Sequence, residues 1–185
     1  MRISTVFSLG MLASLIALPA SAQADDAAAE VARMNVALIG AGGETLGKAS
    51  LEQTPAGVLI TVSASGIGEG EHAFHVHEKG LCDASGGFAS AGGHFAPGGT
   101  AHGYRHSGGP HAGDMPNQFV GSEGKFHAQV LNSAVTLGES GEGALMDADG
   151  SALVIHSGAD DYASQPSGAA GPRVACAVIA PPQAN

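Results

Sequence analysis

The chain has 185 residues, 17 of them acidic and 7 basic, and its formal net charge is −10 at pH 7. Such an acidic chain cannot neutralise a phosphate backbone, so the composition argues against a nucleic acid as partner. The length suffices for one domain with a substantial hydrophobic core.

The first 24 residues have the pattern of a secretory signal peptide. Arg2 gives a basic start, an apolar run covers 6–18, and Ala-x-Ala motifs end at Ala22 and Ala24. The alternative, a buried N-terminal helix, leaves these small-residue exits unexplained. The apolar run is too short to span a bilayer, and no later segment has 18 uninterrupted apolar residues, so we expect no membrane insertion.

Cleavage after Ala24 would divide the chain into a signal peptide (1–24), an N-terminal lead-in (25–34) and one domain (35–185). The removed segment contains one basic and no acidic residue, so the remainder carries a formal net charge of −11. Cys82 and Cys176 are the two cysteines, and in an exported chain an even pair predicts a disulfide. The alternative is two free, buried thiols.

Short strand-like segments dominate the remainder, because 29 glycines interrupt any long helical period. Seven runs bounded by Gly, Pro, Asp or Ser predict strands: 35–40, 47–53, 58–64, 72–78, 125–131, 152–156 and 174–180. Short strands separated by turns favour an all-β sandwich or barrel. The long stretches 82–120 and 157–172 lack strand character, which is typical of functional loops.

The nine histidines are not a tract, so their spacing carries information. His75 and His77 flank a single residue within a predicted strand. Since side chains i and i+2 face the same side of a strand, both imidazoles leave one face of the sheet together. Taken alone, this pair fits a metal site no better than it fits two surface histidines.

A second group of histidines lies in the first long loop. His94 is followed by His102 after 8 residues, by His111 after 9 more and by Asp114 after a further 3. Three imidazoles and one carboxylate make a four-coordinate set that suits zinc, and the intervening glycines let a loop wrap the ion. His156, which ends the predicted strand 152–156, is a further candidate ligand.

In this order, these segments resemble the copper/zinc superoxide dismutase family. The resemblance runs from Val36 to Ile179 and is carried by residues 70–77, 90–95, 109–114, 153–156 and 171–176. It implies an eight-stranded antiparallel Greek-key β-barrel or sandwich with two long functional loops. It also implies an antioxidant oxidoreductase that disproportionates superoxide to oxygen and hydrogen peroxide at a histidine-bridged site, with one copper and one zinc ion per chain.

The resemblance assigns the metal ligands individually. Copper would be bound by His75, His77, His94 and His156. Zinc would be bound by His94, His102, His111 and Asp114, with His94 as the bridge. His106 has the more family-like neighbours, but the spacing within the loop favours His102 as the ligand and leaves His106 at the surface.

The resemblance also implies a catalytic pair. Arg173 would hold the superoxide anion by hydrogen bonds, a task that suits a planar and permanently charged side chain. His94 would dissociate from copper and take up a proton when copper is reduced, and it would give that proton to the departing peroxide when copper is reoxidised. Pro172 directly before the arginine departs from the family pattern, but no departure removes a ligand. Lys79 and Arg105 are candidates for steering the anion, although Lys79 could equally be paired with Glu78.

Further positions are assigned by resemblance to supporting roles. Asp160 would bridge one copper ligand and one zinc ligand, His75 and His102, and so fix their tautomers. His72 would brace its strand through hydrogen bonds without binding metal. Cys82 and Cys176 would form the family's intrachain disulfide.

The short span between His77 and Cys82 resembles bacterial exported members of the family, which implies a periplasmic location. Two other functions stay open: a non-catalytic exported copper- or zinc-binding module or chaperone on the same fold, and a structural zinc domain. Loss of a metal ligand or of Arg173 would favour the first, but none of these residues is lost. The second leaves the histidine pair and Arg173 unexplained. The sequence does not decide between a monomer and a homodimer.

Overall fold

The computed structural model of the chain describes Met1 and residues 32–183. The expected signal peptide and most of the expected lead-in lie outside the described residues, so both stay predictions. None of the helices in the described part of the chain is long and apolar enough to cross a membrane.

The regular structure of the described residues consists of nine strands and one short 3-10 helix. The strands are β1 (Arg33–Gly40), β2 (Thr45–Thr54), β3 (Gly57–Ser65), β4 (Gly70–His72), β5 (Phe74–His77), β6 (Gln118–Val120), β7 (Lys125–Asn132), β8 (Ser151–His156) and β9 (Arg173–Ala180). The helix, η1 (Ala89–Ala91), lies in the first long loop. All seven predicted runs coincide with strands; β6 was missed because three residues are too few for a pattern.

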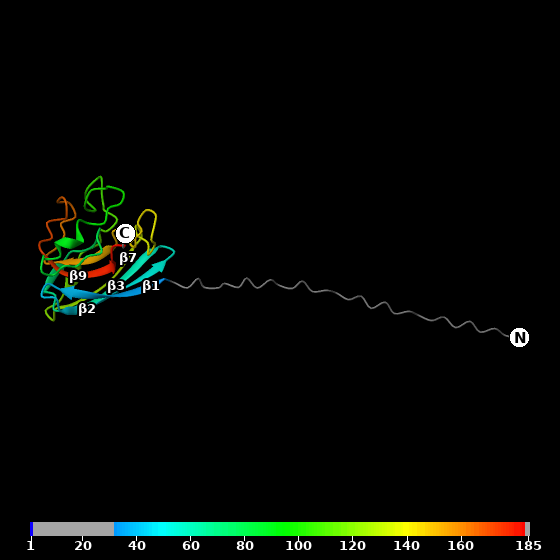
Figure 1. Cartoon of the computed structure of the whole chain (residues 1–185), viewed down its shortest axis with the longest axis horizontal. Helices are drawn as coiled ribbons and strands as arrows, with labels where there is room; N and C mark the ends of the chain where they lie inside the picture. Colours follow the sequence, from blue (N-terminus) through cyan, green and yellow to red (C-terminus); the bar gives the residue numbers. More distant parts are fainter. Residues whose placement is uncertain (2–31, 184–185) are drawn as a thin grey trace.

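Seven antiparallel strands form one sheet in the order β5-β8-β9-β1-β2-β3-β7, and β4 pairs with β6 in a second, two-stranded sheet. The large sheet curls, and the long loops, green and orange in Figure 1, lie together beyond it. The predicted all-β antiparallel fold is therefore confirmed. The count is nine segments instead of eight, because the run 72–78 is divided at Ala73, whose N–H donates to Gly158 O beyond the end of β8 and whose C=O accepts from the His156 N–H.

The core lies inside the curl. Alternate residues of β1, β2, β3 and β7 are fully or nearly fully buried there, among them Leu38, Leu51, Ile60 and Phe126. Every residue of β5 and of β8 is buried, which means that both faces of these two strands are covered. A second apolar cluster, in which Phe88 and Ala91 pack on Val154 and Cys176, covers the outer face of β8. Side chains at the ends of β5 and β8 are thus held in a dry, close-packed setting.

The predicted disulfide is confirmed. Cys82, at the start of the first long loop, is bonded to Cys176 in β9, and their Cα atoms are 5.7 Å apart. The bond fastens the loop that contains His94 to the strand that contains Arg173.

Reducing this disulfide is expected to lower the thermal midpoint. The bond closes a segment of 94 residues, and on the chain-entropy model such a constraint on the unfolded chain is worth about 4–5 kcal/mol. Calorimetry before and after reduction, with thiols counted chemically, measures the effect, and the double variant Cys82→Ser/Cys176→Ser should match the reduced protein. An unchanged midpoint after verified reduction would contradict the expectation.

Candidate metal centre

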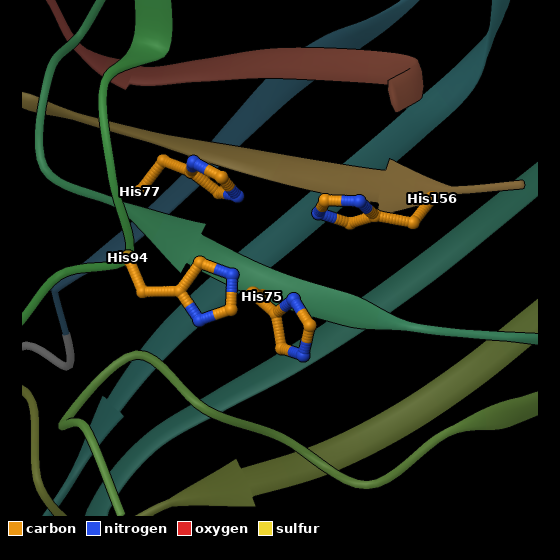
Figure 2. A group of neighbouring side chains, drawn as sticks. All are labelled: His75, His77, His94 and His156. Carbon is orange, nitrogen blue, oxygen red and sulfur yellow. The ribbon is translucent and has the colours of Figure 1, made fainter. Parts of the chain in front are cut away.

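Four imidazoles converge where β5, β8 and the first long loop meet. His75 and His77 leave the same face of β5, His156 ends the neighbouring strand β8, and His94 approaches from the loop (Figure 2). A bridge pairing between His77 and His94 sets the loop against the strand. One ligand atom from each of the four rings lies within 4.8 Å of the others, so the group can hold a single metal ion.

Each of these four rings has one nitrogen engaged and one free. Three of the engaged nitrogens donate to oxygen: His75 Nε2 to Asp160 (2.8 Å), His77 Nδ1 to Gly92 O (3.1 Å) and His156 Nδ1 to Gly171 O (3.1 Å). The fourth, His94 Nδ1, lies 2.8 Å from Asp114 Oδ1 in the second group of ligands. The opposite nitrogens, His75 Nδ1, His77 Nε2, His94 Nε2 and His156 Nε2, are buried without a hydrogen-bond partner. Buried polar atoms are rarely left unpaired, and four nitrogen lone pairs facing one space suit copper.

The second group is centred on the carboxylate of Asp114. Its oxygens lie 2.8 Å from His94 Nδ1, 3.1 Å from His102 Nδ1 and 3.3 Å from His111 Nδ1. The backbone N–H groups of Gly103 and His111 also donate to it, at 2.9 and 3.0 Å. Three imidazoles around one carboxylate fit the tetrahedral N/O set that zinc prefers, and His94 belongs to both groups.

The protonation states in this centre suit metal binding. Burial lowers the pKa of His75 and of His156 to about 4, and it holds that of His77 well below its usual value. Burial alone would raise the pKa of Asp114, but hydrogen bonds from His94 and from the Gly103 N–H hold it well below its usual range. Neutral imidazoles and an ionised carboxylate are the forms that bind metal.

Asp160 lies between the two groups. Its Oδ2 is 2.8 Å from His75 Nε2, and its Oδ1 is 2.9 Å from His102 Nε2. Burial acts to raise the pKa of this carboxyl, but the hydrogen bonds from these two histidines lower it to about 2. An ionised carboxylate therefore contacts one histidine of each group, as the resemblance implied. His72 lies apart from both groups, with its ring nitrogens 2.8 Å from His156 O and 2.9 Å from Gly68 O.

Two carboxamides that the sequence did not single out hold the second long loop to the centre. Asn117 accepts from the backbone N–H of Asp160 at 2.9 Å and donates to its C=O at 2.9 Å. Gln165 does the same for His102, at 3.0 and 2.9 Å. Each side chain thus imitates a strand partner for a residue of the centre. No motif identifies such amides, since Asn and Gln are ordinary loop residues.

A hollow of about 250 Å³ opens above the copper group, lined by Gly93, His94, His111, Pro166, Ser167 and Arg173. The half-buried guanidinium of Arg173 donates to Phe88 O at 2.7 Å and to Gly92 O at 2.5 Å. Among the residues that line the hollow, Arg173 has the permanent positive charge. The hollow can therefore admit a small anion and hold it beside His94.

The other two basic candidates lie elsewhere. Lys79 is exposed and does not line the hollow, and it forms none of the ion pairs found within the described residues, so it is not paired with Glu78. Arg105 donates to the backbone carbonyl of Asp161 at 3.1 Å and lies 5.6 Å from the centre of the Tyr162 ring. Both charges could act on an anion only at a distance.

An all-imidazole site and a three-imidazole, one-carboxylate site that share a ring define a binuclear metalloprotein, here built on a curled antiparallel sheet. Residues 45–179 match the family model described as copper/zinc superoxide dismutase. The chain belongs to the copper/zinc superoxide dismutase family. The predictions of copper and zinc as cofactors, with these two ligand sets and with His102 in the zinc set, are confirmed.

Individual relatives agree with this membership. Superoxide dismutase [Cu-Zn] 2 of Aquifex aeolicus is 50% identical over 143 residues, which are 77% of this chain and 83% of that protein. Superoxide dismutase [Cu-Zn] of Escherichia coli is 32% identical over 181 residues, 94% of this chain and 98% of its own. The crystal structure of a SOD-like protein from Bacillus subtilis has a TM-score of 0.76 at 35% identity, covering 80% of this chain and 99% of that one.

His102→Ala is expected to abolish zinc retention, since His102 Nδ1 faces the Asp114 carboxylate. His106→Ala is the matched control, because His106 belongs to the same loop and is exposed. Elemental analysis after dialysis measures both. Loss of zinc from the His106 variant, with zinc retained by the His102 variant, would contradict the assignment.

Proposed function

We propose that the chain disproportionates superoxide to oxygen and hydrogen peroxide at this centre. The observation that carries the proposal is the position of the His94 ring. Its Nδ1 faces the zinc group, 2.8 Å from Asp114, whereas its Nε2 is buried and unpaired in the copper group. One ring that links an electron-exchanging site to a fixed site can take up and release a proton at one nitrogen while the other stays anchored.

Bound copper would supply one-electron exchange with each superoxide in turn, and zinc would supply a fixed anchor for the bridging ring. His94 Nε2 accepts a proton in the first half of the cycle and donates it to the departing peroxide in the second. In total, two superoxide anions and two protons give one oxygen and one hydrogen peroxide. His75, His77 and His156 keep their orientation because their other ring nitrogens are hydrogen-bonded to protein oxygens.

Arg173 binds the anion in this proposal. Two backbone carbonyls, those of Phe88 and Gly92, fix its guanidinium at the edge of the hollow, leaving the remaining N–H donors of the fork for superoxide. A charge held in place beforehand pays little ordering entropy when the substrate arrives. Although Pro172 before it departs from the family pattern, the Arg173 side chain is held at its guanidinium end by these two carbonyls.

Asp160 and His72 are positioning residues in this proposal. Asp160 orients His75 and His102 through its two oxygens, and Asn117 orients Asp160 in turn. His72 braces the end of β8 through the carbonyl of His156. The ligands therefore keep their geometry when the copper site changes charge.

The proposal includes export, with a periplasmic location. The signal-peptide pattern at the N-terminus supports it, as does the disulfide, since disulfides persist in oxidising compartments. The similarity to the Escherichia coli protein extends over 94% of this chain, so it reaches into the N-terminal segment. A monomer and a homodimer are both compatible with the proposal, because each chain contains a complete centre.

Arg173→Ala is expected to lower the superoxide rate about 10- to 100-fold, because a hydrogen bond to a charged group contributes about 1.5–3 kcal/mol. Metal content should be unchanged, since Arg173 is in neither ligand set. Pulse radiolysis with metal analysis measures both quantities.

Lys79→Ala is the matched control, because it removes an exposed positive charge outside the hollow. Its effect should be modest, confined to low salt and lost as ionic strength rises, since salt screens exposed charges. A fully metallated Arg173→Ala protein with the wild-type rate would refute the anion-binding role. Full occupancy of both metals without any superoxide consumption by the wild type would favour the non-catalytic module instead.

A further inference from the structure

The peptide group between Gly92 and Gly93 is held from both sides. Its carbonyl oxygen accepts hydrogen bonds from His77 Nδ1 at 3.1 Å and from Arg173 Nη2 at 2.5 Å. Its N–H, on Gly93, donates to the carboxylate of Glu78 at 2.9 Å. Since the C=O and N–H of a trans peptide point in opposite directions, one planar group joins Glu78 on one side to Arg173 and His77 on the other.

The backbone around this peptide group is shaped to receive Glu78. Gly92 has φ of +73°, a conformation that favours glycine, and a Cβ placed there would lie 2.5 Å from Glu78 Oε1. The Glu78 N–H also donates to Gly93 O at 3.0 Å. Both the main chain and the side chain of Glu78 are therefore hydrogen-bonded to Gly93, the residue before His94.

We propose that Glu78 is a positioning residue for Arg173 and for the copper ligand His77, and that it acts through the Gly92–Gly93 peptide group. The proposal rests on the role of Arg173 proposed above. A carboxylate that accepts from the peptide N–H fixes the plane of the peptide, and it polarises the carbonyl at the other end, which becomes a better acceptor. Both effects hold the guanidinium at the edge of the hollow.

The charge of Glu78 has an opposite effect on the substrate. Burial lowers the pKa of the Arg173 guanidinium and the Glu78 carboxylate acts to raise it, so the two side chains are close enough to interact electrostatically. The negative charge of Glu78 also repels an anion that approaches Arg173. Glu78 thus favours capture by aiming Arg173 and disfavours it by its charge, and a neutral acceptor at position 78 should separate the two effects.

The test uses the fully metallated protein and its Glu78→Gln and Glu78→Ala variants. Azide, a small anion, serves as the probe of the hollow, and hydrogen exchange of the Gly93 amide measured by NMR on the zinc-loaded, copper-free protein reports the contact itself. Glu123→Gln is the control for charge, because Glu123 is exposed and paired with Lys125 on the surface.

Glu78→Ala should expose the Gly93 amide to exchange and weaken azide binding roughly 2- to 10-fold, the range of one ordinary hydrogen bond. Glu78→Gln keeps an acceptor oxygen, so it should retain Gly93 protection and bind azide at least as well as the wild type. The superoxide rate should follow azide affinity in each variant, and Glu123→Gln should leave both unchanged.

Gly93→Pro tests the same contact from its other side and does not require Glu78 to be altered. It removes the N–H, and the proline ring Cδ takes the place of the hydrogen that points at the Glu78 carboxylate, so the carboxylate must move away. A Cβ at Gly93 would be 3.7 Å from Glu78 Oε1, an ordinary contact. Azide affinity should fall at least as far as in Glu78→Ala.

Unchanged Gly93 exchange in Glu78→Ala would overturn the proposal, and so would azide binding by Glu78→Gln as weak as that by Glu78→Ala. If Arg173→Ala itself leaves azide affinity unchanged, then the proposed role of Arg173 fails. In that case Gly93 exchange and the effect of Gly93→Pro on azide binding show separately whether Glu78 acts on the centre.

Discussion

The shared imidazole of His94 is the constraint on which the rest of the centre depends. One ring can belong to two groups of metal ligands only if both groups lie directly beside that ring. Here the His94 ring centroid is 4.1 Å from that of His75, in the copper group, and 5.0 Å from that of His102, in the zinc group. Two metal cations bound to one imidazole would repel each other. The buried carboxylates of Asp114 and Asp160 would offset this repulsion, because hydrogen bonds keep both ionised.

The fold meets this constraint by dividing the ligands between rigid and adjustable elements. Strands β5 and β8, buried on both faces, hold three of the copper histidines, while loop residues supply His94 and the zinc ligands. The loops are then fastened individually: the Cys82–Cys176 disulfide ties the first loop to β9, and Gln165 and Asn117 tie the two loops together. Some of the glycines are positions where backbone approaches backbone, as at Gly103 against Tyr162.

Much of the fold and all seven ligands could be predicted from the sequence. Short-range patterns were enough for the strands and for the zinc group, whereas the copper group was assigned through the resemblance to the family. The i, i+2 spacing of His75 and His77 is a property of any strand, and the His94–Asp114 spacing identified His102 correctly over His106. β6, which pairs with β4, is too short for a sequence pattern, and the break at Ala73 could not be predicted because it depends on contacts with Gly158 and His156 far along the chain. Asn117, Gln165 and Glu78 were missed for the same reason: each acts on the backbone of a distant residue, which leaves no signature in the sequence.

The most direct test of the shared ring is a metal titration of the metal-free protein. At saturation we expect one copper and one zinc per chain, because seven side chains form two four-ligand groups with His94 in common. We also expect that adding zinc to the copper-loaded protein changes the copper electron paramagnetic resonance spectrum, since zinc would be held by the other nitrogen of the His94 ring. A single metal per chain at saturation, or a copper spectrum that zinc leaves unchanged, would show that His94 is not shared between two metal ions.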